Sequence, residues 1–148
     1  MKYLNLRYVL TAIIAFVFVQ SVFFKFSGAN ETRYIFETLG NWSGFDWFSH
    51  YGAYLIGIAE LIAVLLLLTR ISGLGALLTV GIMSGAIFFH LFTPLGVQMP
   101  EFDVTGQVIG NDGGLLFIMA CIVWLSGAVL CVRDIKSENG ILGKILNR

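Results

Sequence analysis

Glu60 is the residue of this 148-residue chain whose position most clearly suggests chemistry. It lies in the apolar run from Tyr51 to Leu68, which is long enough to cross the roughly 30 Å hydrocarbon core of a bilayer as a helix. An ionisable residue at the centre of such a helix costs about 2.5–3.5 kcal/mol on insertion scales, so it normally faces a partner, water or the bundle interior. Two interpretations are open: Glu60 joins helices by hydrogen bonding, or it binds a ligand or handles protons.

Further polar residues near the ends of other apolar segments are candidate members of the same site: Gln20, Lys25, Ser84, His90 and Asp112. Lys25 is the best-placed cation for Glu60, because its flexible stem can reach inward; the alternative is that it snorkels to the membrane surface. His90 is the other candidate partner, since its charge changes near neutral pH, but it could also be a polar helix tip. Asp112 precedes two glycines and fits a helix N-cap.

The composition places the chain among integral membrane proteins. Hydrophobic residues make up 57% of it and charged residues 12%, whereas soluble domains carry about 25% charged residues. The length suits a single domain spanning residues 1–148. The formal net charge is zero, so no basic field indicates a nucleic-acid partner.

The hydropathy pattern predicts an all-α protein, a bundle of four transmembrane helices in the lipid bilayer. The helices are expected at about residues 7–26, 50–68, 73–92 and 112–132, the first being retained rather than cleaved as a signal peptide. Between the first two, an aromatic amphipathic segment predicts a short interfacial helix that Asn30 caps and Gly40 ends. Its aromatic residues could instead cover a ligand pocket. Both prolines fall in the segment 93–111, which is expected to be a loop with a short extended turn.

Small residues and cysteines give further expectations. Gly81-x-x-x-Gly85 predicts a close helix contact, and Gly57 would let another helix approach near Glu60. Cys121 and Cys131 are ten residues apart in one helix, about 15 Å along its axis, so they cannot form a disulfide with each other. They are expected to be buried small apolar residues, and no cluster predicts a metal site.

Basic residues predict the orientation. Seven of them flank one side (Lys2, Arg7, Arg70, Arg133, Lys136, Lys144 and Arg148), and only Lys25 and Arg33 flank the other. By the positive-inside rule both termini are cytoplasmic and the segments 27–49 and 93–111 lie outside. The candidate polar residues would then line an outward-opening cleft that narrows towards Glu60, suited to a proton path, a quinone headgroup or a small polar ligand. The alternative is a set of unrelated caps, tips and snorkelling side chains.

The order of several short motifs resembles the DoxX family of small four-helix membrane proteins. The resemblance covers about Arg7 to Val132. This chain differs from the shorter family members in that both of its expected outer loops are longer. It rests on Phe24-Lys25-Phe26-Ser27-Gly28, Phe36 with Leu39-Gly40, Gly57-x-x-Glu60 followed by leucines and Arg70, Gly75-Ala76, Met83 with Gly85-Ala86, His90-Leu91, and Asp112-Gly113-Gly114.

The resemblance implies a multi-pass protein of the bacterial cytoplasmic (inner) membrane, associated with membrane redox systems. On that basis we expect a subunit or accessory of a quinone-linked system, with a bound quinone, no covalent cofactor, and electrons supplied by the quinone or a redox partner protein. Two alternatives stay open: a non-enzymatic assembly or scaffold protein, and a small-solute or proton carrier, which would require a homo-oligomer.

Overall fold

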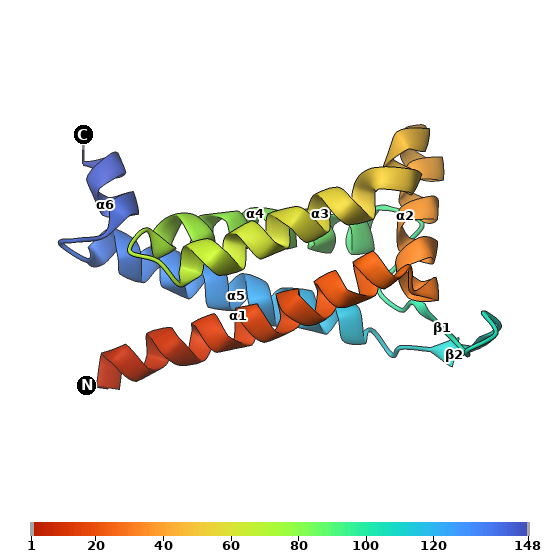
Figure 1. The fold of residues 1–148 in the computed structure, drawn as a ribbon, viewed down its shortest axis with the longest axis horizontal. Helices are drawn as coiled ribbons and strands as arrows, with labels where there is room; N and C mark the ends of the chain where they lie inside the picture. The colour runs from red at the N-terminus through yellow and green to blue at the C-terminus, as the bar shows by residue number, and fades with distance from the viewer. Residues whose placement is uncertain (1, 148) are drawn as a thin grey trace.

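Four long apolar helices run side by side in the computed structural model, which describes residues 2–147 and side chains from residue 6 to residue 147 (Figure 1). They are α1 (Lys2–Ser27), α3 (Asp46–Leu67), α4 (Ser72–Phe92) and α5 (Leu115–Lys136). Each contains a stretch long and apolar enough to cross a membrane, with mean hydropathy between 1.8 and 2.7. The expectation of an all-α protein with four candidate spans is confirmed, although α1 and α3 begin earlier and α5 lies slightly later than predicted.

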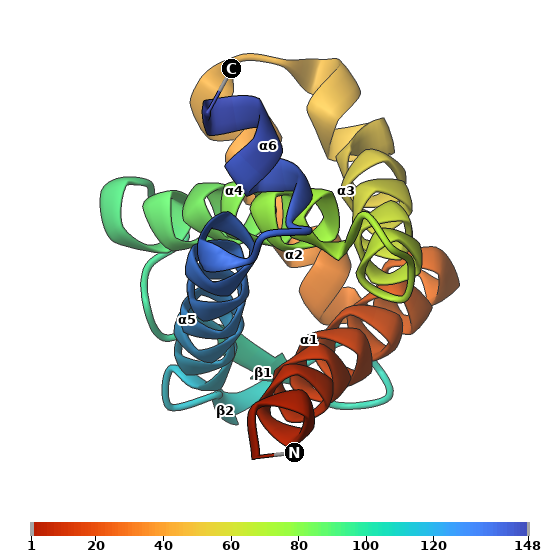
Figure 2. The ribbon, with the colours of Figure 1, turned by 90° about the vertical axis from the view of Figure 1, so that its left-hand side faces the viewer.

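The four helices surround a core to which each contributes (Figure 2). Its centre consists of fully buried side chains: Ile14 and Phe18 from α1, Ala63 from α3, Ala76 from α4 and Val123 from α5. The outward surfaces are equally apolar, with Phe16, Leu65 and Phe92 each more than 60% exposed. A helix that is apolar on all sides fits a lipid environment. The chain is therefore a multi-pass membrane protein.

Glycines allow the closest helix contacts, at positions other than those predicted. A Cβ on Gly75 would lie 2.6 Å from the backbone nitrogen of Leu67, so α4 presses directly on α3 there. By contrast, a Cβ on Gly81 or Gly85 would meet nothing within 4 Å. The predicted contact through Gly81 and Gly85 is wrong for this chain. At about 100° per residue, both glycines fall on the side of α4 opposite its buried face.

A shorter helix, α2 (Asn30–Ser43), lies across one end of the bundle (Figure 1). It is the helix predicted for the first connecting segment, but two details of its ends were wrong. Ala29, not Asn30, is the N-cap, and the helix continues through Gly40 to Gly44, whose φ of 75° is left-handed. Gly40 serves packing rather than termination, because a Cβ there would collide with the side chain of Ser49.

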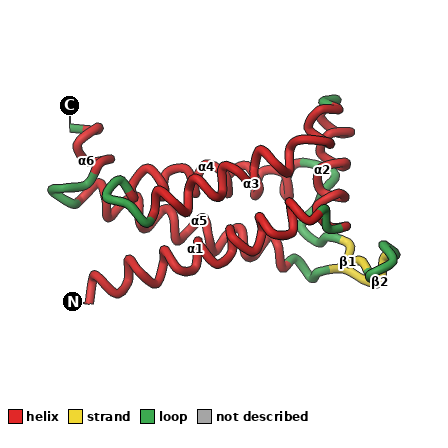
Figure 3. The backbone as a smooth tube through the Cα atoms, viewed as in Figure 1, coloured by secondary structure: helices red, strands yellow, loops and turns green. Residues whose placement is uncertain are grey.

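The remaining elements mark the two ends of the bundle (Figure 3). Beside α2 lies an antiparallel hairpin of β1 (Pro100–Phe102) and β2 (Val108–Asn111), which realises the predicted extended turn. The opposite end, called here the terminus end, holds both ends of the described chain, the α3–α4 connection and α6 (Ile141–Leu146). Both termini therefore lie on one side of the four candidate spans.

We predict that Gly75→Leu lowers the melting temperature of the purified protein strongly, because the new side chain would separate α4 from α3. Overpacking of this kind costs about 1–3 kcal/mol or more. Gly81→Leu is the matched control, since it changes helix propensity equally but adds its side chain to open space. Equal destabilisation by both substitutions, measured by thermal unfolding in detergent, would contradict the packing described here.

Candidate functional site

Lys25 of α1 and Glu60 of α3 form an ion pair inside the bundle. The Lys25 Nζ atom donates to Glu60 Oε1 at 3.0 Å and to Oε2 at 3.1 Å. The side chain of Glu60 is 2% exposed and that of Lys25 is 14% exposed. Of the two cations considered as partners for Glu60, the structure thus places Lys25 beside it.

Ser21 completes this group, which we call the Lys25–Ser21–Glu60 cluster. Its hydroxyl donates to Glu60 Oε1 at 3.2 Å and accepts a hydrogen bond from Lys25 Nζ. Ser21 is not among the six predicted site residues, although its spacing of four residues from Lys25 predicts that both side chains share one face of the helix.

Gly57 determines how closely α1 and α3 approach beside this cluster. It lies one turn before Glu60, and a Cβ on it would be 2.8 Å from the ring of Phe26. The missing side chain lets Phe26 pack on α3, where its ring centroid is 5.6 Å from that of Tyr54. Gly57 therefore allows the close approach that the sequence predicted, and Phe26 brings the preceding residue, Lys25, to α3.

Electrostatic attraction holds the Lys25 ammonium and the Glu60 carboxylate together. In a low-dielectric interior the attraction between opposite charges is far stronger than in water, and an isolated buried charge is correspondingly unfavourable. Both oxygens of Glu60 accept a charged hydrogen bond, and the formal charges of the pair cancel. The cluster can hold a carboxylate in an apolar bundle, and Lys25 keeps part of its surface accessible.

His90 and Asp112 belong to a second site, where the loop after α4 meets the start of α5. The Nδ1 atom of buried His90 lies 2.7 Å from the carbonyl oxygen of Gly96, and its ring packs edge-on against Phe117. Asp112 Oδ1 accepts hydrogen bonds from two backbone N–H groups, those of Met99 at 2.9 Å and Gly114 at 2.8 Å. Its Oδ2 accepts another from Leu116, in the first turn of α5, at 3.2 Å. Gly114, not Asp112, is the N-cap residue of α5, two residues later than predicted. The Asp112 carboxylate nevertheless accepts a hydrogen bond from an N–H of the first turn and ties down the loop.

Partial burial opposes the ionisation of Asp112, but the three backbone hydrogen bonds outweigh it and hold the pKa of this carboxyl below its usual range. The nearby His90 contributes in the same direction. A lowered pKa means that the folded state favours the ionised carboxylate over the protonated carboxyl more strongly than the unfolded state does. Asp112 thus stabilises the fold at neutral pH, and this contribution is lost as the pH falls through its pKa.

Gln20 and Ser84 lie outside both groups. Both residues are exposed, and the Ser84 hydroxyl accepts a hydrogen bond from Trp124 Nε1 at 2.9 Å and donates one to the Val80 carbonyl at 2.7 Å. The six predicted site residues therefore do not form a single cleft that narrows towards Glu60. The prediction of an inward orientation was wrong for these two, because hydropathy identifies a helix without fixing its rotation.

The two cysteines both lie on α5, within the part of the chain whose side chains are described, residues 6–147. Cys121 and Cys131 are free thiols, and both are partly exposed rather than fully buried as expected. Within that range, His, Cys, Asp and Glu side chains do not gather in a group of three that could hold a metal ion.

We predict that Asp112→Ala destabilises the protein by about 1–2 kcal/mol at neutral pH, as for the loss of other helix caps. Because the folded pKa is lowered, the difference from wild type should shrink below roughly pH 4, the range in which an unfolded aspartate becomes protonated. Thermal unfolding in detergent across this pH range measures both effects. Glu101→Ala, an exposed acid on the neighbouring strand, is the control; an equal loss in that variant would argue against the capping role.

Comparison with known proteins places these features in context. The family model described as the DoxX-like family matches residues 9–100, which is more than half of the chain. The matched segment includes Lys25, Glu60 and His90 and ends before Asp112. Searches of curated proteins and of solved structures found no match.

Proposed function

Since the chain belongs to the DoxX-like family, we propose that it serves a quinone-linked redox system of the bacterial inner membrane as a subunit or accessory protein. The observation that carries this proposal is the Lys25–Ser21–Glu60 cluster, a charged group within two candidate spans whose lysine is still 14% exposed. Intramembrane ionisable residues generally mark ligand or proton sites.

The chemistry of the cluster suits a quinone headgroup. The ammonium of Lys25 or the hydroxyl of Ser21 would donate a hydrogen bond to a carbonyl oxygen in place of a present bond within the cluster, and Glu60 can accept a proton. The Phe26 and Tyr54 rings beside the cluster offer aromatic surface. A bound quinone would supply the redox chemistry, while these residues would bind it and hold or move protons. Electrons would be exchanged with a partner protein.

One observation favours a second function. The three polar groups already satisfy one another, as expected for a lock that only joins α1 to α3 in an assembly or scaffold protein. The third possibility, a proton or solute carrier, has less support. Among the described residues, no hydrogen bond links the Lys25–Ser21–Glu60 cluster to His90 or Asp112 in a continuous polar path.

The first two functions are separated by substituting both members of the ion pair, singly and together. Glu60→Gln leaves Lys25 without its counter-charge, and Lys25→Gln does the reverse. Each should lower stability, by about 3–5 kcal/mol for a fully buried pair and by less where Lys25 can turn to the surface. The double variant is neutral and should recover most of that loss. Glu37→Gln, an exposed acid on α2, is the control.

The same variants, purified in native-lipid nanodiscs, test the quinone directly. We expect mass spectrometry of extracted lipids to find quinone with the wild type and the Glu37→Gln variant. It should be depleted in the single variants and in the double variant, although the latter is stable. Quinone retained equally by the stable double variant, or absent from the wild type, would contradict the quinone proposal. Its absence throughout, with the stability pattern intact, would favour the lock.

We also propose that the terminus end faces the cytoplasm. Its side carries Arg7, Arg70, Arg133, Lys136 and Lys144, whereas Lys25 and Arg33 lie towards the other end. In a background without Cys121 and Cys131, a cysteine replacing exposed Ser43 should react with an impermeant thiol reagent in intact cells. One replacing exposed Ser137 should not. The opposite labelling pattern would reverse the proposed orientation.

A further inference from the structure

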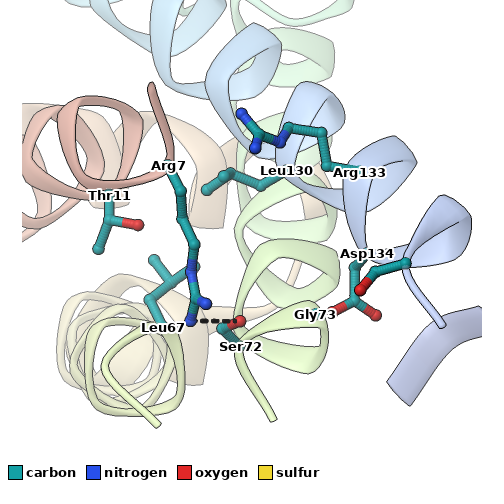
Figure 4. A pocket seen from close by; sticks show the side chains of 9 residues that line it. Arg7, Thr11, Leu67, Ser72, Gly73, Leu130, Arg133 and Asp134 are labelled. Atoms are coloured by element: carbon teal, nitrogen blue, oxygen red, sulfur yellow. Dashed lines mark hydrogen bonds between the residues drawn. The ribbon is translucent and has the colours of Figure 1, made fainter. Parts of the chain in front are cut away.

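A cavity of about 250 Å³ opens at the terminus end and is lined by residues of α1, α3, α4 and α5 (Figure 4). Its polar lining includes Arg7 and Thr11 from α1, Ser72 from α4, and Arg133 and Asp134 from α5. The cavity is smaller than the roughly 300–1,000 Å³ of sites for drug-sized ligands. It has room for a small polar group rather than for a whole cofactor.

The candidate spans place this cavity at the boundary of the bilayer. The span of α1 begins at Leu6, that of α3 ends at Leu67, that of α4 begins at Ser72 and that of α5 ends at Lys136. Leu67 and Ser72 line the cavity themselves, and the other two limits are each next to a lining residue. Its depth is therefore that of the lipid headgroups, where phosphate groups are the commonest anions.

Two arginines give the cavity a positive character. The guanidinium of Arg7 donates a hydrogen bond to Ser72 Oγ at 3.0 Å, across the space between α1 and α4. Among residues 6–147, Arg7 forms no ion pair. The side chain of Arg133 lines the same cavity from a different helix, α5.

Asp134, the one acid among the lining residues, is engaged elsewhere. Its Oδ2 atom accepts a hydrogen bond from the backbone N–H of Leu142, at the start of α6, at 2.8 Å. The same carboxylate packs on Gly73 so closely that a Cβ there would lie 2.3 Å from Oδ2. These contacts hold the negative charge against the first turns of α4 and α6. The lining thus has two guanidinium groups and one carboxylate.

We propose that this cavity binds a phosphate group, carried by an anionic phospholipid headgroup or by free phosphate. Guanidinium groups pair with phosphate through parallel charged hydrogen bonds, which makes arginine well suited to this ligand. Basic pockets between transmembrane helices at the membrane surface are typical sites for anionic headgroups. Arg7 is the central residue, because it reaches across the opening from α1 to α4 and would join these helices through the ligand. This site is separate from the Lys25–Ser21–Glu60 cluster and does not depend on quinone binding.

The test uses the full-length protein in mild detergent, with phosphatidylglycerol, phosphatidylcholine or inorganic phosphate as the probe. Native mass spectrometry counts retained lipid, and thermal unfolding measures stabilisation. We expect the wild type to retain phosphatidylglycerol preferentially. Arg7→Gln should bind it roughly tenfold more weakly or worse, as for the loss of a charged hydrogen bond. Arg7→Lys, which keeps the charge without the planar fork, should show an intermediate loss.

Arg70→Gln is the matched control, because Arg70 is exposed at the same end of the bundle but does not line the cavity. A loss specific to Arg7→Gln supports the site, and the probe that stabilises the wild type more identifies the source of the phosphate. Equal losses in Arg7→Gln and Arg70→Gln would show only diffuse surface attraction and overturn the proposal. The proposal would also be overturned if neither phosphatidylglycerol nor inorganic phosphate stabilised the wild type more than phosphatidylcholine does. Arg7 is exposed, so its variants should fold; wild-type thermal stability without added lipid verifies this.

Discussion

The contact between Lys25 and Glu60 is an ion pair inside an apolar bundle, and it joins α1 to α3. Neither charge is favourable alone in an apolar bundle, so each requires the other, and this requirement fixes the relative position of α1 and α3. In lipid the hydrophobic effect gives little preference for one helix rotation over another, whereas an ion pair has only one satisfactory geometry. The ion pair sets the rotation of α1 about its axis. This rotation also places Ser21 beside Glu60 and the Phe26 ring beside Gly57.

Small residues act together with this pair by allowing the backbones to approach. Gly57 admits the Phe26 ring beside the pair, and Gly75 brings α4 against α3. Gly127 has the same role for α5, since a Cβ there would lie 3.3 Å from the carbonyl oxygen of Ala76. Close packing contributes dispersion energy that lipid tails cannot match without gaps, and a misplaced side chain at these points would separate the helices. Polar pairing selects the arrangement, and close packing gives it stability.

The sequence predicted the features that depend on composition along the chain, and it was less successful with those that depend on rotation about a helix axis. The four apolar helices follow directly from hydropathy. That Glu60 needs a partner followed from the rule that a charge within a membrane is costly alone, with Lys25 as the best-placed cation and His90 as the alternative; the choice between them did not follow. The open positions of Gly81, Gln20 and Ser84 did not follow, because each lies on an apolar helix where every face has similar hydropathy. Gly40 shows a related difficulty, because a glycine can mark either a helix end or a close contact. Its contact is with Ser49, which belongs to the next helix, so the residues around Gly40 alone did not reveal it.

The distribution of polar groups suggests how the protein divides its tasks between levels of the bundle. At the terminus end, Arg7 and Arg133 line an open cavity beside the ends of the candidate spans. At the other end, Asp112 and His90 use their polar atoms to tie a loop to helix ends, which leaves them less available for a ligand. Between these levels, Lys25 and Glu60 neutralise each other, and only the lysine retains access to the surroundings. A molecule that reaches the pair from outside would therefore meet the lysine side chain before the carboxylate. Under the quinone proposal this order matters, because a carbonyl oxygen would take a hydrogen bond from the Lys25 ammonium in place of one to Glu60 or Ser21, whereas a cation would be repelled by the charge of Lys25.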